Sequence, residues 1–265
     1  MLNTFFIAIF TAISVISFNI RVGGAPDGAN SWENRKPATI AMIEDQKPDF
    51  LTIQEGMEDQ MRYIEQSCIA EYQAIGIAPD SQGTKGEHMT MFFRKDRFEC
   101  LDWGTFWLSE TPDKSSKGWD GAYPRTATWA RMKHLESGEE FFIINTHLDH
   151  IGVEARRKGI ELILSRMNEI NEDFLSVILT GDFNCTVDSE ELQALVNSMS
   201  NARENAEKTD GIKSYNNWGK GSQSTIDFIW YSGFSKCASF ETITQRYAGK
   251  PFISDHYPIK AVLEF

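Results

Sequence analysis

The sequence has little cysteine and a shortage of basic residues. Its four cysteines (Cys68, Cys100, Cys185 and Cys237) show no C-x-x-C spacing, which argues against a zinc ribbon or a thioredoxin-like motif. They are also too sparse for a disulfide framework, so we expect buried free thiols. Lysine and arginine total 26 against 38 acidic residues, a net charge of −12. An acidic surface repels polyanions, which argues against tight, sequence-independent binding along duplex DNA.

The motifs of several common enzyme classes are also missing. The sequence contains no GxSxG, no GxxxxGK[ST] and no HExxH, so it lacks the signatures of serine hydrolases of the nucleophile-elbow type, P-loop NTPases and zinc proteases. Gly23-Gly24 follows a predicted strand without a GxGxxG pattern. We interpret this pair as a turn.

The apolar start of the chain is short and is broken by Thr and Ser, and it is too short to span a bilayer. Ala12-Ile13-Ser14 is a small-x-small cleavage site, but no Lys or Arg precedes the apolar run. Residues 1–12 are therefore interpreted as an N-terminal extension or leader. The compartment stays open: the cytoplasm is favoured, and a secreted or periplasmic location follows if residues 1–14 are a signal peptide.

The remainder of the chain, residues 13–265, predicts a single α/β (α+β) domain. The apolar fraction of 41% and the 18 Phe support a well-filled core, and no linker or repeat interrupts the chain. Apolar or alternating runs predict strands, and amphipathic patterns with Asn30-Ser31 and Asp188 or Ser189 as cap candidates predict helices. The strands are expected at 13–20, 50–54, 73–78, 89–94, 98–103, 126–133, 140–146, 175–180, 225–231, 237–243 and 258–264, and the helices at 32–46, 58–69, 153–170 and about 189–199. So many consecutive strands fit two packed sheets flanked by helices better than an alternating Rossmann pattern.

A long polar loop, SETPDKSSKGWDGAYP, covers residues 109–124. Loops of this length in a compact domain are usually functional or mobile, so it is either a lid or substrate-contacting loop or a surface insertion. Trp119 within it is a candidate for stacking on a base or sugar, or for anchoring the loop. Arg125 follows the loop and is a candidate for bidentate contact with a phosphate, the alternative being a surface arginine on a strand.

Polar side chains that can bind a metal or a phosphate lie at the ends of six predicted strands. Each has an ordinary explanation as a turn residue, a satisfied buried carboxylate or a structural histidine, but six such sites are hard to dismiss together. They are Asn19; Gln54-Glu55; Asn145, His147 and Asp149; Asp182 and Asn184; Asp227; and Asp255-His256. Side chains at one edge of packed sheets converge in space, as binding residues do on many strand-built scaffolds.

The chemistry of this set points to phosphate. Carboxylate and amide oxygens suit a hard cation such as Mg²⁺ or Mn²⁺ rather than structural zinc. Imidazoles near such a cation suit phosphate chemistry, where charge is stabilised and a water is aimed in line. A carboxylate beside an imidazole, as in Asp255-His256 or Asp227 with His256, favours the protonated imidazole.

The ordered motifs FN, QE, NTHLD, GDFN, ID and SDH resemble the endonuclease/exonuclease/phosphatase (DNase I-like) superfamily of metal-dependent phosphoesterases. The resemblance runs from about residue 13 to the C-terminus. The segment FWLSETPDKSSKGWDGAYPRTATWA resembles a bacterial branch whose substrates are poorly defined. The resemblance implies a four-layer sandwich, in which two packed, mostly antiparallel sheets are flanked by helices.

The resemblance also implies roles for individual residues. On the metal side, Glu55 would be the principal Mg²⁺ (or Mn²⁺) ligand, with Asn19 close by and Asp255 sharing the ion. On the phosphate side, each expected catalytic residue would act on the attacking water, on the phosphate or on a proton. Asp182 would orient or deprotonate the water, Asn184 would hold phosphate or nucleophile, His256 would contact the scissile phosphate with Asp227 or Asp255 fixing its tautomer, and His147 would be a second phosphate-side imidazole. Arg125, Asn145 and Trp119 are the expected substrate-binding residues.

The sequence thus predicts a Mg²⁺-dependent hydrolase that cleaves a phosphoester bond by in-line water attack, without deciding between monoester and diester. The acidic charge and the lack of a basic stripe favour a small or single-stranded substrate, such as a nucleotide, a short oligonucleotide or a sugar or inositol phosphate. A sphingomyelinase-like or deadenylase-like activity is an alternative within the class. A non-catalytic binding module is the alternative outside it, although every expected catalytic position is occupied. No protein partner is indicated, and we expect a monomer.

Overall fold

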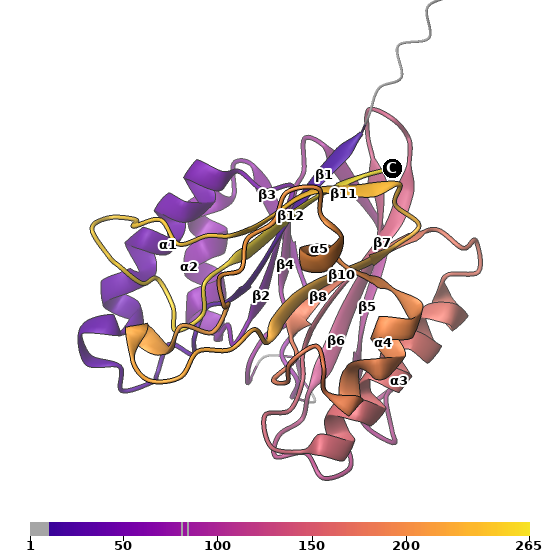
Figure 1. Ribbon diagram of the computed structural model, residues 1–265, viewed down its shortest axis with the longest axis horizontal. Helices are drawn as coiled ribbons and strands as arrows, with labels where there is room; N and C mark the ends of the chain where they lie inside the picture. Colours follow the sequence, from indigo (N-terminus) through magenta and orange to yellow (C-terminus); the bar gives the residue numbers. More distant parts are fainter. Residues whose placement is uncertain (1–10, 81, 84) are drawn as a thin grey trace, which may run out of the picture.

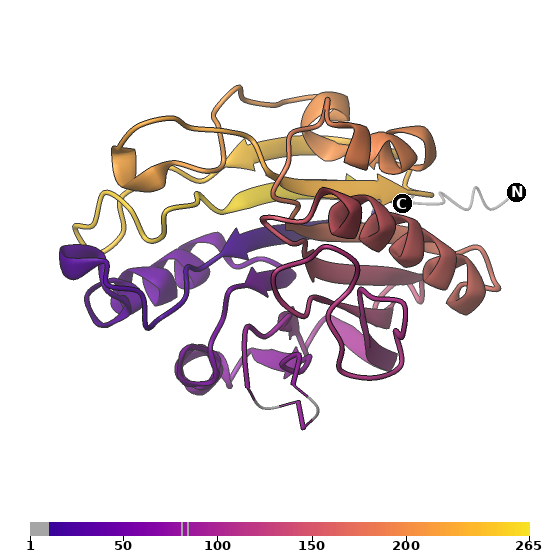
Figure 2. The ribbon, with the colours of Figure 1, turned by 90° about the horizontal axis from the view of Figure 1, so that it is seen from below.

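The computed structural model describes residues 11–80, 82–83 and 85–265, and in this part of the chain twelve strands form two sheets of six. The first sheet has the order β11 (Lys236–Thr242), β12 (Ile259–Glu264), β1 (Ala12–Asn19), β2 (Phe50–Gln54), β4 (Met91–Arg94), β3 (Tyr72–Ile75). The second has the order β5 (Phe98–Trp107), β6 (Thr126–His134), β7 (Glu140–His147), β8 (Ser176–Asp182), β10 (Asp227–Ser232), β9 (Ser200–Asn201). Strands from the two ends of the chain, β1 and β12, lie side by side and antiparallel (Figure 2).

Helices cover the outer faces of both sheets. Helices α1 (Trp32–Gln46) and α2 (Glu58–Cys68) lie on one side of the molecule, and α3 (Val153–Ile170) and α4 (Gln193–Ser198) lie on the opposite side (Figure 1). The short helices η1 (Gly28–Asn30), η2 (Glu190–Leu192), α5 (Ala202–Asn205) and η3 (Asn217–Gly219) lie in connections. One apolar cluster fills the space between the sheets, and two more lie under the helix pairs. The fold is therefore the four-layer sandwich that the sequence predicts.

The pairing of the strands explains why their ends meet. Strand β1 runs parallel to β2, with Asn19 opposite Gln54, and β7 runs parallel to β8, with His147 opposite Asp182. Strand β10 is antiparallel to β8, so that its first residue, Asp227, also lies opposite Asp182. The carboxyl ends of four strands and the amino end of a fifth therefore share one edge of the sandwich.

Most predicted elements are present with small shifts at their ends, and three details differ. Strand β5 continues to Trp107 instead of ending at residue 103, and β9 and α5 were not predicted. The predicted helix at 189–199 begins as the 3-10 turn η2 before α4. Ser31 and Ser189 stand at N-cap positions, but neither hydroxyl accepts a capping hydrogen bond. Tertiary packing rather than capping therefore fixes these two starts.

The structure also describes the cysteines, the Gly-Gly turn and part of the N-terminal segment. All four cysteines are free; Cys68, Cys185 and Cys237 are buried and Cys100 is partly buried. Gly23 and Gly24 form the predicted turn. Of the predicted extension at 1–12, residues 1–10 lie outside the described residues. None of the helices in the described part of the chain is both long and apolar enough to cross a membrane.

Candidate active site

Three polar residues around the shared edge adopt left-handed backbone conformations. The φ angles are +60° at Arg21, +59° at Glu55 and +52° at Asn184. Such values are uncommon for residues other than glycine and cost roughly 1–2 kcal/mol each. All three residues line the same cavity. Sharp turns directly after β1, β2 and β8 thus direct polar side chains into one place, and strain of this kind concentrates at functional sites.

Asp182 lies at the centre of the site. Its Oδ2 accepts a hydrogen bond from Asn19 Nδ2 at 2.8 Å, across the gap between the two sheets. The same oxygen lies 3.6 Å from His147 Nε2 and 3.8 Å from His256 Nε2. Gly181 allows β8 to pass close to β7 just before Asp182, because a Cβ there would lie 2.2 Å from the Thr146 carbonyl oxygen. Asp182 thus accepts a hydrogen bond from an amide and has two imidazole nitrogens within 4 Å.

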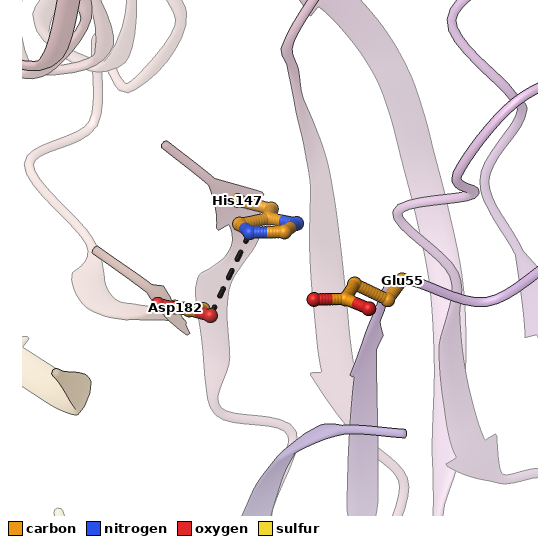
Figure 3. A group of neighbouring side chains, drawn as sticks. All are labelled: Glu55, His147 and Asp182. Carbon is orange, nitrogen blue, oxygen red and sulfur yellow. Dashed lines mark ion pairs between the residues drawn. The ribbon is translucent and has the colours of Figure 1, made fainter. Parts of the chain in front are cut away.

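Glu55 extends from the end of β2 toward Asp182 and His147 (Figure 3). Its Oε1 accepts a hydrogen bond from Asn19 Nδ2 at 3.0 Å, and its Oε2 accepts one from the Val22 N–H at 3.0 Å. Asn19 therefore bridges the carboxylates of Glu55 and Asp182 with one amide group. The Arg21 guanidinium lies nearby: its Nη1 is 4.0 Å from Glu55 Oε2, and its Nε is 3.7 Å from Asp255 Oδ2.

The donor set fits a hard divalent cation. Ligand atoms of Glu55, His147 and Asp182 lie within 4.8 Å of one another, and a second such group joins Asp182, Asp227 and His256. Burial, together with the negative charge of Glu55, raises the pKa of Asp255. Carboxylates crowded in this way are relieved by a cation, and oxygen-rich sites prefer Mg²⁺ or Mn²⁺. Glu55 thus belongs to the first of these groups, and the negative charge of Glu55 acts on Asp255; that these two carboxylates share an ion stays a prediction.

Buried Arg35 on α1 holds the two chain segments that carry this acidic side of the site. Its guanidinium donates to the carbonyls of Ile20, of Arg21 at 2.6 Å and of Ile253 at 3.3 Å. The turn after β1 is thereby tied to the segment that leads into Asp255. Burial lowers the pKa of Arg35 to about 10, yet it remains a cation at neutral pH.

His256 and Asp227 form a buried ion pair. His256 Nδ1 lies 2.9 Å from Asp227 Oδ2, and both side chains are almost fully buried. Burial lowers the pKa of an imidazole, but the charges of Asp227 and Asp182 outweigh burial and raise the pKa of His256 to about 10. Of the two carboxylates that the sequence offers as partners, Asp227 is therefore the one that fixes the ring. The opposite nitrogen, Nε2, faces Asp182.

His147 lies in a second charged cluster with Arg125 and Glu87. Arg125 Nη1 lies 2.5 Å from Glu87 Oε2 and 2.9 Å from His147 Nδ1, and His147 Nδ1 lies 3.1 Å from the same Glu87 oxygen. Burial opposes the charge of Glu87, but the bond to His147 and the charges of His147 and Arg125 lower its pKa to about 2. Arg125 is only 8% exposed, so it is a wall residue of the site and not a surface arginine.

Two predicted substrate-binding residues lie elsewhere. Asn145 is fully buried between the sheets, where its Nδ2 donates to the Ile53 carbonyl at 2.7 Å and its Oδ1 accepts from Gln54 at 2.7 Å. Its side chain is occupied in joining β7 to β2, which corrects the expectation of substrate contact. Trp119 is not among the described residues that line the cavity around Asp182 or the larger cavity beside it, whereas Tyr123 lines both.

The loop at 109–124 is anchored at its end. Asp149 accepts from the N–H groups of Ala122 at 2.9 Å and Tyr123 at 3.1 Å, and Asp120 accepts from the Ala155 N–H at 2.7 Å at the start of α3. Asp149 therefore braces the end of this loop. Tyr123 then stacks on His150, with ring centroids 5.8 Å apart and an interplanar angle of 17°.

Several residues of the site wall are not among the predicted site residues. Glu87, Tyr123, His150, Tyr215 and Arg21 all line the cavity around Asp182. Arg21 and Tyr123 lie within two residues of motifs that were recognised, which is the one available signal for them. Glu87, Tyr215 and His150 come from loops without periodicity. The lining residues surround a cavity of about 500 Å³, within the size range of small-molecule sites.

The chain is similar to known proteins in both sequence and structure. The model of the endonuclease/exonuclease/phosphatase family matches residues 16–256. A crystal structure of a member of that family from Bacteroides thetaiotaomicron is 32% identical, covers 97% of this chain and 98% of that chain, and superposes with a TM-score of 0.91. The Bacteroides thetaiotaomicron mannosyl-6-phosphatase Bt3783 is 32% identical, covers 96% of this chain and 100% of that chain, and has a TM-score of 0.90.

A curated relative is more distant. The uncharacterized protein L388 of Acanthamoeba polyphaga mimivirus is 27% identical over 165 residues, which are 58% of this chain and 59% of that protein. The match thus spans less than two thirds of the relative.

Proposed function

Because the chain belongs to the endonuclease/exonuclease/phosphatase family, whose members hydrolyse phosphoester bonds, we propose that it is a Mg²⁺-dependent phosphatase of small sugar phosphates. One observation carries the proposal: Glu55, Asp182, His147 and His256 converge on a cavity of about 500 Å³. That volume suits one phosphate with one sugar ring. The net charge of −12 disfavours long polyanions, and the similarity to the mannosyl-6-phosphatase supports a sugar as the leaving group.

Glu55 and Asp255 are the residues that would hold the metal, with Asn19 positioning Glu55 through its amide. The bound cation would supply Lewis-acid stabilisation of the phosphoryl oxygens. Arg21, between the two carboxylates, limits their mutual repulsion before the metal binds. This arrangement predicts that loss of Glu55 weakens metal binding more than it weakens the chemical step.

The protein's own groups handle the water and the phosphate. Asp182 Oδ2 is positioned to accept the proton of the attacking water, because Asn19 fixes one of its sides and the two imidazoles face the other. His256, held as a cation by Asp227, donates through Nε2 to a phosphoryl oxygen and stabilises the charge that develops there. Asn184 packs against His147 at 3.0 Å and fixes that ring beside the phosphate.

A substrate panel tests the proposal. p-Nitrophenyl phosphate, bis-p-nitrophenyl phosphate, a hexose 6-phosphate and a nucleoside monophosphate are each incubated with Mg²⁺ or with EDTA. We expect Mg²⁺-dependent phosphate release, fastest from the hexose phosphate, that is lost in Asp182→Ala. The matched control Asp188→Ala removes an exposed carboxylate nearby in the chain and should retain full activity.

Two results would contradict the proposal. Phosphate release that is equal in Asp182→Ala and in the wild type would contradict the site. Faster cleavage of the diester than of any monoester would contradict the assignment as a phosphatase.

A further inference from the structure

A second cavity of about 670 Å³ lies beside the active site. We propose that it binds the sugar units beyond the phosphorylated one, so that the substrate is a phosphorylated oligosaccharide rather than a free sugar phosphate. This inference rests on the proposed function and deepens it, because it assigns a ligand class to a part of the molecule outside the catalytic residues.

The two cavities are adjacent and share part of their lining. Val22, Glu87, Tyr123, Arg125 and His147 line both of them. In the proposed binding mode, a ligand whose phosphate lies near Asp182 and His256 extends past Arg125, which lines both cavities, into the second cavity. Each cavity alone has the volume of a small-molecule site, so the two together have room for a ligand larger than a single hexose phosphate.

The lining of the second cavity combines apolar surfaces with a few polar groups. Met57, Met89, Pro79 and Pro124 supply apolar surface. Tyr123 is 60% exposed, and its ring is supported from behind by His150. A sugar ring has an apolar face of C–H groups that packs on an aromatic ring, while its hydroxyls need hydrogen-bond partners at the edge. This combination of surfaces suits a carbohydrate.

Glu87 supplies a polar partner at the boundary. Its Oε2 is engaged by Arg125 and His147, whereas its Oε1 takes no hydrogen bond from any residue that the structure describes. A carboxylate oxygen accepts hydrogen bonds from sugar hydroxyls, and the low pKa of Glu87 keeps it ionised.

The charge of the lining argues against a second phosphate group. Two basic residues, Lys85 and Arg125, face two acidic ones, Asp80 and Glu87, and Arg125 is already paired with Glu87. His147, which also lines this cavity, is engaged by Glu87 and Arg125 as well. The described lining therefore leaves Lys85 as the one basic residue outside this cluster, whereas a nucleic-acid backbone needs basic contacts at each of its phosphates. An uncharged polar extension of the substrate fits this balance.

A variant that fills the second cavity tests the role of that cavity independently of the catalytic site. Met57 lines the second cavity and not the first, so Met57→Trp blocks the second cavity and leaves the catalytic residues in place. Met57→Leu is the volume-conserving control. The substrates are a hexose disaccharide phosphorylated at a 6-hydroxyl, the matching hexose 6-phosphate, a nucleoside monophosphate, and glycerol phosphate, which is small enough for the catalytic cavity alone.

We expect wild-type kcat/KM to be about tenfold higher for the phosphorylated disaccharide than for the hexose phosphate. Met57→Trp should remove this advantage through KM and leave the rate on glycerol phosphate unchanged, and Met57→Leu should behave as wild type. The absence of a disaccharide advantage in the wild type would overturn the inference. So would a nucleoside monophosphate that is preferred to the disaccharide, or an equal loss on all substrates in a folded Met57→Trp.

A calorimetric measurement of how the wild-type protein binds the unphosphorylated disaccharide keeps the two proposals distinguishable. This measurement does not depend on whether the Met57→Trp variant folds. Wild-type protein should bind this neutral saccharide. Saccharide binding without phosphate release from any substrate would overturn the proposed function alone. Turnover of glycerol phosphate without saccharide binding would overturn the second cavity alone.

Discussion

His256 Nδ1 lies 2.9 Å from Asp227 Oδ2, although the two residues are 29 positions apart in the chain. The pair joins the first residue of β10 to the segment just before β12, and so connects the two sheets at the edge that carries the site. With its pKa raised to about 10 by the surrounding carboxylates against the effect of burial, His256 is a fixed cation at neutral pH. It can stabilise phosphoryl charge without first taking up a proton.

Asp227→Asn tests this relationship. The substitution keeps the shape but removes the negative charge that holds the imidazolium, so kcat should fall about 100-fold while KM changes little. Because the two residues act as one unit, Asp227→Asn/His256→Ala should be no slower than His256→Ala alone. Steady-state kinetics at saturating Mg²⁺ measure both effects. Independent, multiplying losses in the double variant would show that the pair does not act as a unit.

Glu55→Gln tests the metal side. Loss of a carboxylate ligand should raise the Mg²⁺ concentration needed for half-maximal activity by about 10–100-fold. Glu58→Gln is the control, because Glu58 is an exposed carboxylate three residues later, at the start of α2. A Mg²⁺ titration of activity gives the comparison. An unchanged metal requirement in Glu55→Gln would remove Glu55 from the metal site.

Asn19→Asp tests the amide that bridges Glu55 and Asp182 at 3.0 and 2.8 Å. A third carboxylate there repels the other two, so the variant should melt at a lower temperature than the wild type in EDTA. Added Mg²⁺ should restore much of this loss, because a cation between the carboxylates removes the repulsion. Thermal melts with and without Mg²⁺ measure it. Equal Mg²⁺ stabilisation of Asn19→Asp and wild type would contradict a metal bound beside Asn19.

Asp149→Asn tests the anchor of the loop that presents Tyr123. Burial opposes the charge of Asp149, but the N–H groups of Gly152, Ala122, Ile151 and Tyr123 lower its pKa to about 2. Loss of these charge-assisted bonds should reduce the free energy of unfolding by roughly 2 kcal/mol at neutral pH. An unfolded aspartate has a pKa of about 3.9, so the stabilisation is complete above that value and is lost as the pH falls toward 2.

Urea unfolding at pH 6 and at pH 3 measures this dependence. The difference between wild type and Asp149→Asn should shrink at the lower pH, and Glu136→Gln, at an exposed carboxylate, should show no such trend. A difference that stays constant with pH would mean that the charge of Asp149 does not stabilise the loop.

The convergence of polar residues at the strand ends could be predicted, because the apolar pattern of each strand and the polar residue at its end are visible in the sequence. A buried strand followed by a polar residue, as in β8 with Asp182, is visible in the sequence, and parallel pairing brings such ends together. Asn145 shows the limit of this argument. It points to the same face of β7 as His147 but lies two residues, about 7 Å, deeper in the sandwich, where it bonds to β2 instead of reaching the cavity.

The wall residues could not be predicted in the same way. Glu87 lies in a loop whose conformation depends on packing against Arg125 and His147, residues 38 and 60 positions further along the chain. Tyr123, rather than the larger Trp119, lines the cavities, because Asp149 fixes the backbone of the loop at Ala122 and Tyr123. Such contacts join residues far apart in the chain and leave no periodic signal.

In the proposed reaction, Asp182 directs water onto a phosphorus atom at a metal site. Hydrolysis of a hexose 6-phosphate in ¹⁸O-labelled water, followed by mass spectrometry of both products, tests it most directly. We predict that the label enters inorganic phosphate and not the sugar, that release requires Mg²⁺, and that Asp182→Ala abolishes the labelled phosphate. Label in the sugar hydroxyl, or labelled phosphate formed at the wild-type rate by Asp182→Ala, would contradict the account.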